Sequence, residues 1–159
     1  MRLTTLTTAA VVVISLTCIC IAQQTISYKT YRNARFAYSI NYPSSLLVPQ
    51  GESTNGDGQK FASKDRRAEL IVYGSNNALD QTLQQAFDEA KAPSGDRIVS
   101  YQTMKQDWFV VSGTEGGKIF YQKTYLRAGV FKTMRIEYDE QLKNTYDAVT
   151  TKVSLSFKG

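Results

Sequence analysis

Hydrophobic side chains alternate with polar or small ones over several short stretches of the chain. In "RFAYSINYP", Phe36, Tyr38, Ile40 and Tyr42 occupy every second position before Pro43 ends the run. A period of two residues is typical of a strand with one buried face. The pattern therefore predicts a half-buried strand near the start of the domain.

Similar patterns predict the rest of a sheet. Further strands are expected at 26–30, 60–63, 68–73, 97–104, 108–114, 118–127 and 130–138. The run "LIVY" inside 68–73 is nearly all apolar, which favours a central strand covered on both faces. A short apolar plug and a long Gly-, Asn- and Asp-rich turn fill 46–59. The last four strands are joined by the short turns "KQD", "EGG" and "AG", so we expect an antiparallel meander.

Two segments have helical rather than strand spacing. Apolar residues recur at helical intervals over 79–90, and Asn77 with Asp80 three residues later resembles a capping box. A second apolar stripe runs through 142–153, after the acidic start at Asp139. The order of strands, helix, meander and helix predicts one α+β domain. Its mostly antiparallel sheet has about six to seven strands and is flanked by two main helices.

The N-terminal segment differs from this domain in composition. Residues 9–22, "AAVVVISLTCICIA", are apolar or small, and Cys20 and Ala22 occupy the small-residue positions that signal peptidase reads. We therefore predict cleavage after Ala22. The chain divides into a signal peptide, 1–22, and a single exported domain, 23–159.

Two other interpretations of this segment compete with cleavage. No charged residue lies between Leu3 and Ala22, so an uncleaved membrane anchor is the alternative. A lipoprotein would need a small residue just before the lipidated cysteine, but Thr17 precedes Cys18 and Ile19 precedes Cys20. The lipoprotein is the weaker of the two.

Composition limits the chemistry of the processed domain. Both cysteines lie in the leader and the chain has no histidine, which excludes a disulfide, a thiol nucleophile, a Cys or His zinc site and an imidazole base. We accordingly expect no catalytic role, no cofactor and no metal.

The charge of the domain is mildly basic. The chain has 19 Lys and Arg against 14 Asp and Glu, and the leader removes only Arg2. For an exported protein this favours an anionic envelope component or a protein partner over nucleic acid.

Three phrases of the sequence together resemble a known family. "RFAYSINYPSSL", "GDGQKFASKDRRAELIVYG" and the closing "YDAVTTKVSLSF" are similar to the PsbP-like superfamily, which includes PsbP of photosystem II, a Ran-binding release factor and DcrB-like periplasmic proteins. The resemblance implies an α/β/α sandwich and a non-enzymatic binding or accessory role. The long basic extension and the histidines of the photosystem members are absent here, so the resemblance is to the exported bacterial branch.

The stretch "STNGDGQKFASKDRR", residues 53–67, is the first candidate site. Aligned with a calcium loop it has Asn55, Asp57 and Gly58 at ligand and glycine positions, but Lys64 stands where a Glu must supply two oxygens. We therefore interpret it as turns rather than a calcium site. Its polar and basic side chains form a candidate interaction loop, for which the alternative is a solvated, aggregation-resistant surface. They are Asn55, Asp57, Lys60, Lys64, Arg66 and Arg67.

The hairpin "KIFYQKTYLRAGVFKTMRIEY" is the second candidate site. A two-residue turn at Ala128 and Gly129 would place Tyr121 opposite Ile136 on a mostly apolar core face. The opposite, mixed face either lies under a helix or faces a partner, and a slip of one residue would exchange the two faces. Its candidate contacts are Gln122, Thr124, Thr133 and Arg135.

These features support three hypotheses for function. The first is an exported, monomeric binding module without catalysis that recognises an envelope partner. The second is an accessory protein that retains its N-terminal segment as a membrane anchor. The third is a hydrolase with a serine nucleophile and a lysine base, which requires a pocket that holds both within hydrogen-bond reach.

Overall fold

The computed structural model describes residues 25–159, so the predicted signal peptide lies outside the described residues. This part of the chain forms nine strands, a short 3₁₀ helix and two α-helices. They are β1 (Lys29–Asn33), β2 (Tyr38–Tyr42), β3 (Val48–Glu52), β4 (Gly58–Ala62), β5 (Ala68–Asn76), α1 (Leu83–Lys91), β6 (Ile98–Met104), β7 (Trp108–Glu115), β8 (Lys118–Arg127), β9 (Val130–Asp139), η1 (Glu140–Leu142) and α2 (Lys143–Ser156).

Seven of the strands form one antiparallel sheet in the order β3-β4-β5-β9-β8-β7-β6, while β1 and β2 pair separately. The predicted meander is β6 to β9. The predicted register of its last hairpin is confirmed, because Tyr121 lies opposite Ile136 and Thr124 opposite Thr133. The turn itself has left-handed backbone at both Ala128 (φ 49°) and Gly129 (φ 70°), the conformation that a tight two-residue hairpin needs.

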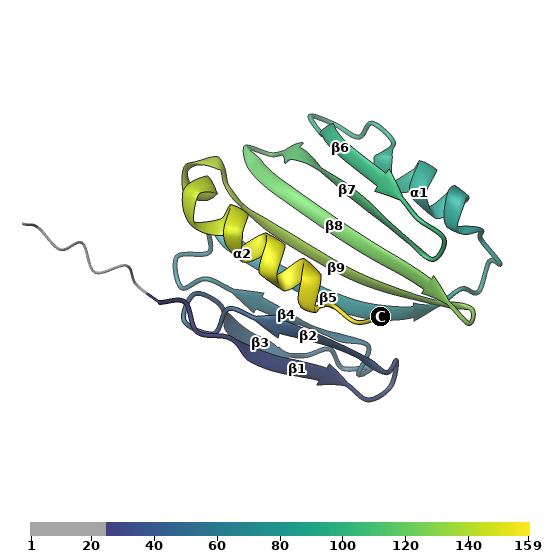
Figure 1. Cartoon of the computed structure of the whole chain (residues 1–159), viewed down its shortest axis with the longest axis horizontal. Coiled ribbons are helices and arrows are strands. Elements are labelled where there is room, and N and C mark those ends of the chain that lie inside the picture. Colours follow the sequence, from purple (N-terminus) through teal and green to yellow (C-terminus); the bar gives the residue numbers. More distant parts are fainter. Residues whose placement is uncertain (1–24) are drawn as a thin grey trace, which may run out of the picture.

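One face of the sheet is covered by a layer made of α2 and the β1–β2 hairpin, which lie side by side in Figure 1. This layer buries the larger core, to which β2, β4, β5, β8, β9 and α2 all contribute. Its fully buried members include Ile40, Phe61, Leu70, Val72, Met134, Ile136, Val149 and Val153. Burial of this apolar surface is the main stabilising term of the fold.

The other face is covered by α1, but only in part. Phe87 of α1 packs against Phe109, Val111 and Phe120 of β7 and β8. The contacts of α1 are with β6 and β7, and α1 lies behind that end of the sheet in Figure 1. The predicted α+β class, with a mainly antiparallel sheet and two flanking helices, is confirmed. Within residues 25–159, no helix lies over the same face of β4, β5 and β9.

The start of α1 differs from the sequence prediction. The helix begins at Leu83 with Thr82 as its N-cap, and Thr82 and Gln85 form a reciprocal capping box. Asn77 instead exchanges hydrogen bonds with the backbone of Gln81, and Asp80 has a left-handed φ of 48°. The helical spacing of apolar residues extends into this turn, which is why the prediction began too early.

Two strand predictions also need correction. β3 was not predicted, because its five residues are all exposed and show no alternation. β5 is central in the sheet, but it is not covered on both faces, since Ile71 is half-buried and Tyr73 is 39% exposed. The run "LIVY" belongs to a strand that has a neighbouring strand on each side, and it does not mean that another layer covers each face of that strand.

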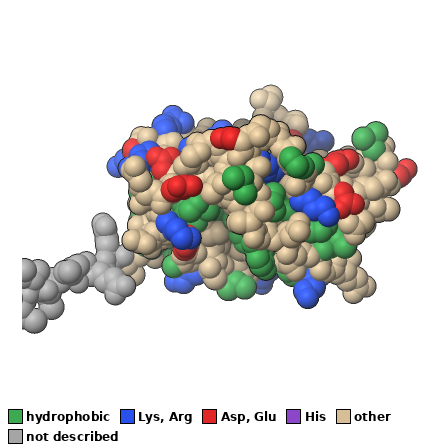
Figure 2. Space-filling model, turned by 90° about the horizontal axis from the view of Figure 1, so that it is seen from above, with side chains coloured by type: hydrophobic (Ala, Val, Ile, Leu, Met, Phe, Trp, Pro, Cys, Tyr) green, Lys and Arg blue, Asp and Glu red, His purple; other side chains and the backbone are tan. Residues whose placement is uncertain are grey.

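The two edges of the large sheet are both irregular. Pairing shifts between Pro49 and Glu52 at the β3 edge and between Val99 and Tyr101 at the β6 edge. Figure 2 shows the molecule from above, with several hydrophobic side chains exposed near the middle of the view. On β6, Ile98, Tyr101 and Met104 are exposed. Irregular pairing at an edge opposes addition of a further strand.

Candidate binding groove on the sheet

The uncovered part of the sheet forms a groove with α1. Its volume is about 330 Å³, and strands β5, β8 and β9 form its floor while α1 forms one wall. The lining residues are Tyr73, Ser75, Gln81, Ala86, Glu89, Ala90, Phe109, Gln122, Thr124, Phe131 and Thr133. Three of the four predicted sheet-face residues therefore lie together in this groove.

The floor of the groove is a small hydroxyl network. Thr124 and Thr133 are opposite each other in the β8–β9 register, and their Oγ1 atoms are 3.0 Å apart. Gln122 donates to Thr124 Oγ1 through Nε2 at 3.5 Å. Both threonines are buried, so their hydroxyls bond to each other rather than to solvent. The Gln122 amide keeps further hydrogen-bonding capacity for a ligand.

The walls combine aromatic and polar side chains. Tyr73 is next to Thr133 across the β5–β9 pair, and Phe131 is opposite Ser75. On the helix side, Gln81 donates from Nε2 to Glu89 Oε1 at 2.7 Å. A groove of this size with apolar walls and a few polar groups fits one side chain or a short segment of a partner.

Arg135 lies beyond the groove and is already paired. Its guanidinium contacts Glu115 Oε2 at 2.6 Å and Glu137 Oε2 at 3.4 Å, and it lies 4.5 Å from the ring centre of Phe120. Two carboxylates and an aromatic ring therefore compensate this charge. Arg135 holds β7 and β9 together and does not extend the groove.

The residues of the predicted interaction loop are divided between β4, which contains Lys60, and the two turns at its opposite ends. Asn55 and Asp57 lie in the β3–β4 turn, whereas Lys64 and Arg66 lie in the β4–β5 turn. A strand of this length spans roughly 15 Å. The structure therefore does not bring the predicted residues together into one site.

The β3–β4 turn is satisfied by its own side chains. Asp57 accepts hydrogen bonds from the Ser53 hydroxyl and from Asn55 Nδ2, and the Ser53 bond is the main reason that the pKa of Asp57 is lowered. Arg35 donates to the carbonyl of Asn55. Among residues 25–159, no group of three or more His, Cys, Asp or Glu side chains is placed to hold a metal ion. This geometry is that of a turn closed by Asx-type hydrogen bonds.

The basic residues of the stretch are mostly engaged. Lys60 pairs with Glu69 at 3.0 Å across the β4–β5 pair, and Arg67 pairs with Asp139 at 2.7 Å. Only Lys64 and Arg66 extend freely from the β4–β5 turn within the described part of the chain. Two exposed cations in one turn are ordinary protein surface.

The hydrolase hypothesis requires a serine hydroxyl bonded to a lysine. Lys123 Nζ donates to the backbone carbonyl of Ser154 at 3.3 Å, while Ser154 Oγ bonds to the Tyr121 hydroxyl at 2.8 Å. Within the part of the chain that the structure describes, no lysine ammonium is hydrogen-bonded to a serine hydroxyl. The hypothesis therefore receives no support from this geometry.

Sequence reasoning missed the groove walls. The sequence pattern places Tyr73 and Phe131 on strands, and Gln81 and Glu89 in the helical segment, without marking any of them as a site residue. The register of the hairpin identifies the floor, because strand alternation is local. How much of the sheet α1 covers depends on tertiary packing, which leaves no signal in the spacing of residues.

Comparison with known proteins agrees with this architecture. No protein-family model matches the sequence, and no curated protein matches it. Among solved structures, the chain is similar to cyanobacterial PsbP (CyanoP) from Synechocystis sp. PCC 6803, solved in solution. The TM-score is 0.61 at 16% sequence identity, covering 87% of this chain and 96% of that one. The domain thus has a PsbP-like α+β fold.

The lengths of the helices bear on whether either of them could span a membrane. Between residues 25 and 159, neither α-helix is long and apolar enough to cross a bilayer.

Proposed function

We propose that this protein is an exported, non-catalytic binding module that recognises a protein partner through the groove between α1 and the sheet. The observation that carries the proposal is the asymmetry of the two sheet faces. On one face, α2 and the β1–β2 hairpin pack over β4, β5 and β9, whereas the other face leaves Tyr73, Gln122 and Phe131 facing a cavity of about 330 Å³. Aromatic side chains beside a few polar groups are typical of interface centres.

The chemistry of the groove favours apolar contact over charge attraction. Its one ionisable wall residue besides Tyr73 is Glu89, and the nearby Arg135 is neutralised by Glu115 and Glu137. An anionic envelope component would bind elsewhere, on the exposed cations of the domain. Binding in the groove should therefore resist salt, since salt screens exposed charges but not buried apolar contacts.

Crosslinked capture from envelope extracts tests this proposal. The bait is the domain from residue 23, compared with Tyr73→Asp in the groove and Tyr101→Asp as a matched control. Both tyrosines are exposed strand residues, but Tyr101 belongs to β6. We expect capture by the wild type and by Tyr101→Asp at both low and high salt, and loss of capture by Tyr73→Asp.

Two outcomes would contradict the groove as the binding surface. Capture that persists in Tyr73→Asp places the partner elsewhere. Capture that disappears at high salt in the wild type indicates an anionic partner held by exposed cations.

Export and processing need a separate measurement. We propose cleavage after Ala22, and the charge-free stretch from Leu3 to Ala22 favours a retained anchor as the second candidate. Intact-mass measurement of the protein recovered from its native host decides between them. Loss of residues 1–22 supports the soluble module, whereas a full-length mass in the membrane fraction supports the anchored accessory protein.

A further inference from the structure

A second cavity adjoins the groove on the same face of the sheet, and we call it the edge cavity. Its volume is about 310 Å³, and strands β3, β4 and β5 form its floor. Tyr73 lines both the groove and the edge cavity, so this side chain separates them. Gly58 is opposite Tyr73 in the β4–β5 pair, and residues that are directly opposite share a face. Because residue 58 has no side chain, the floor of the edge cavity is open beside Tyr73.

The spacing of the two cavities suits two side chains of one extended segment. The middle strands of their floors are β9 and β4, which are separated by β5 in the sheet order. Two strand spacings amount to roughly 10 Å, which is the length of about three residues of extended chain. A segment that crosses Tyr73 can therefore place one side chain in each cavity.

The edge cavity is suited to an apolar side chain. Both of its charged residues are already engaged, because Lys60 pairs with a glutamate at 3.0 Å and Asp57 accepts hydrogen bonds from two side chains of its own turn. Ile71 is half-buried and Tyr73 is 39% exposed, so both offer apolar surface that a partner can cover. Removal of this surface from water favours binding.

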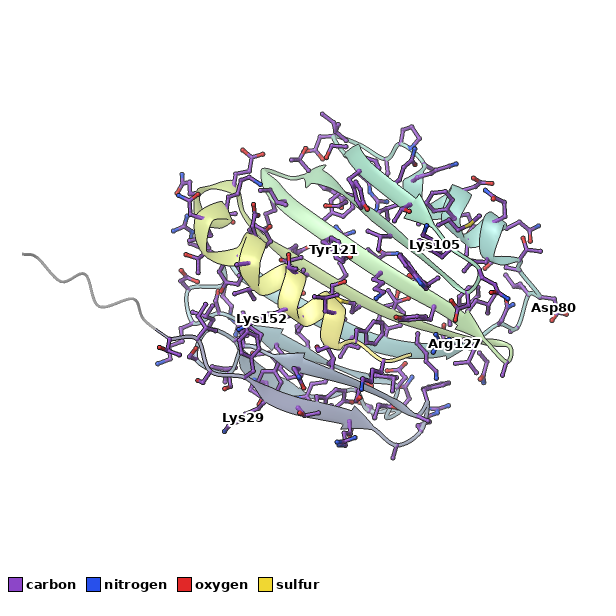
Figure 3. All side chains as sticks on the ribbon, viewed as in Figure 1. Lys29, Asp80, Lys105, Tyr121, Arg127 and Lys152 are labelled. Atoms are coloured by element: carbon purple, nitrogen blue, oxygen red, sulfur yellow. The ribbon has the colours of Figure 1, made fainter. Side chains whose placement is uncertain are left out.

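The groove differs from the edge cavity because it contains a carboxylate without a cationic partner. Glu89 accepts a hydrogen bond from Gln81 at Oε1. Within residues 25–159, no lysine or arginine forms an ion pair with Glu89, whereas the adjacent Asp88 pairs with Lys91 at 2.7 Å. Asp80, in the turn before α1, projects outward at the edge of the molecule in Figure 3. Glu89 is thus the carboxylate that a ligand in the groove meets.

The charges beside the groove cancel one another. Arg135 contacts Glu115 and Glu137, and Lys118 pairs with Glu137 at 3.7 Å. The chain as a whole is basic, but the unpaired charge of the groove is negative. A cationic side chain of a partner is therefore attracted to the groove, and an anionic one is repelled.

From these observations we infer that the groove partner is an extended peptide segment that places a Lys or Arg side chain in the groove and an apolar side chain in the edge cavity. The inference rests on the proposed function and names the chemistry of its partner. The aliphatic part of the basic side chain packs against Phe131 and Ala90. Its charged end pairs with Glu89 beside the ring of Tyr73.

The ion pair with Glu89 selects the partner more than it strengthens binding. An exposed ion pair contributes little free energy, so the apolar contacts supply most of the affinity. A segment with an acidic side chain at the same position would face repulsion from Glu89, which gives specificity. Binding at high salt is therefore retained.

Selection of random peptides displayed on phage tests this inference. The bait is the domain from residue 23, and peptides that also bind Tyr73→Asp are removed. We expect the remaining peptides to be enriched in Lys or Arg, with an apolar residue about three to four positions away. The same selection with Glu89→Lys as bait should enrich Asp or Glu in place of the basic residue.

The affinity of one selected peptide gives a quantitative test. Fluorescence anisotropy measures its Kd for the wild type, Glu89→Gln and Asp88→Asn. Glu89→Gln should weaken binding about threefold to fivefold, the effect of one exposed ion pair. Asp88→Asn changes the net charge equally and on the same helix but lies outside the groove, so it should bind like the wild type. Replacement of the basic residue of the peptide by Leu should weaken binding to the wild type more than binding to Glu89→Gln.

The outcomes separate this inference from the proposed function. Peptides that depend on Tyr73 but show no basic enrichment would overturn the inference and leave the groove as the binding surface. Peptides that bind the wild type and Tyr73→Asp equally would contradict the groove itself. If no peptide is enriched, the groove does not accept an extended segment and the inference is wrong. Equal affinity of the wild type and Glu89→Gln, or an equal loss in Asp88→Asn, would show that the Glu89 carboxylate is not a contact.

Discussion

Ala128 adopts the backbone conformation that its hairpin needs but that alanine disfavours. Its φ is 49°, and Gly129 follows with φ 70°. A left-handed residue with a Cβ costs roughly 1 kcal/mol, and Asn is better tolerated there than Ala. The hairpin is formed all the same, because its strands pair over ten positions.

Ala128→Asn should therefore raise the free energy of unfolding by about 0.5–1 kcal/mol. Urea denaturation of the variant and the wild type measures the difference. Gly129→Ala is the matched opposite change and should lower the same quantity. A decrease in Ala128→Asn would show that the turn is not of the expected type.

Tyr146 is a residue whose ionisation opposes folding. Burial raises its pKa from 10.0 to about 12, and burial raises the pKa values of Tyr38 and Tyr138 as well. The folded protein thus holds this proton more tightly than the unfolded chain. The associated stability is complete below pH 10 and is lost as the pH rises from about 10 to about 12.

Tyr146→Phe should make alkaline destabilisation less steep. Between pH 10 and 12 the slope of the unfolding free energy against pH should decrease by about 1.4 kcal/mol per pH unit, the contribution of one proton. Denaturant titrations at several pH values measure the slope. An unchanged slope would mean that Tyr146 ionises equally in both states.

At the scale of elements, α1 is held against the sheet by few buried side chains. It has nine residues, and Phe87 is its buried side chain. So short a helix is marginal on its own and depends on its cap and on packing. Because α1 forms one wall of the sheet groove, its N-cap also positions the candidate binding surface.

Thr82→Ala should destabilise the domain by about 1 kcal/mol, because it removes a capping box. The bonds lost are those of Thr82 Oγ1, which accepts from the Gln85 backbone N–H at 3.2 Å and donates to Gln85 Oε1 at 3.1 Å. Chemical denaturation compares it with Gln84→Ala, an exposed change on the same helix, which should stay within about 0.5 kcal/mol of the wild type. If the two variants lost the same free energy of unfolding, the N-cap of α1 would lie elsewhere, for example at Asn77.

Elements with strong local signals could be predicted from the sequence. The strand at Tyr38–Tyr42 and the whole β8–β9 register follow from strict alternation around a two-residue turn. The exposed edge strand β3 and the true start of α1 could not be predicted, since neither is marked by apolar spacing. Likewise, the residues on the floor of the groove can be predicted from the β8–β9 register. The residues of its walls cannot, because they depend on where α1 packs against the sheet.

At the scale of the whole molecule, the domain has an asymmetric three-layer architecture. The layer of α2 and the β1–β2 hairpin covers one face over β4, β5 and β9, and α1 covers part of the other face. The similarity of the fold to that of CyanoP at 16% identity shows that very different side chains support this fold. The three phrases that resemble the PsbP-like superfamily predict this architecture. They include none of the α1 residues that form one wall of the groove.

Stability should depend on pH mainly at the extremes. The chain has no histidine, and the pKa values of Asp57, Asp65, Asp88 and Asp147 are lowered in the fold. A lowered folded pKa gives stability that is present above the ordinary value of 3.8 and is lost as the pH falls through the folded pKa. We expect a nearly constant thermal midpoint from about pH 5 to 8 and a decline below about pH 4. A marked change between pH 6 and 7 would contradict this expectation.

The central claim is that a partner binds the uncovered face of the sheet. Photo-crosslinking in the native host tests it most directly, with p-benzoylphenylalanine placed at Tyr73 in the groove or at Arg32 on the outer side of the β1–β2 hairpin. The account predicts a discrete crosslinked species from position 73 that is absent from position 32. The opposite pattern, or equal crosslinking from both positions, would contradict it.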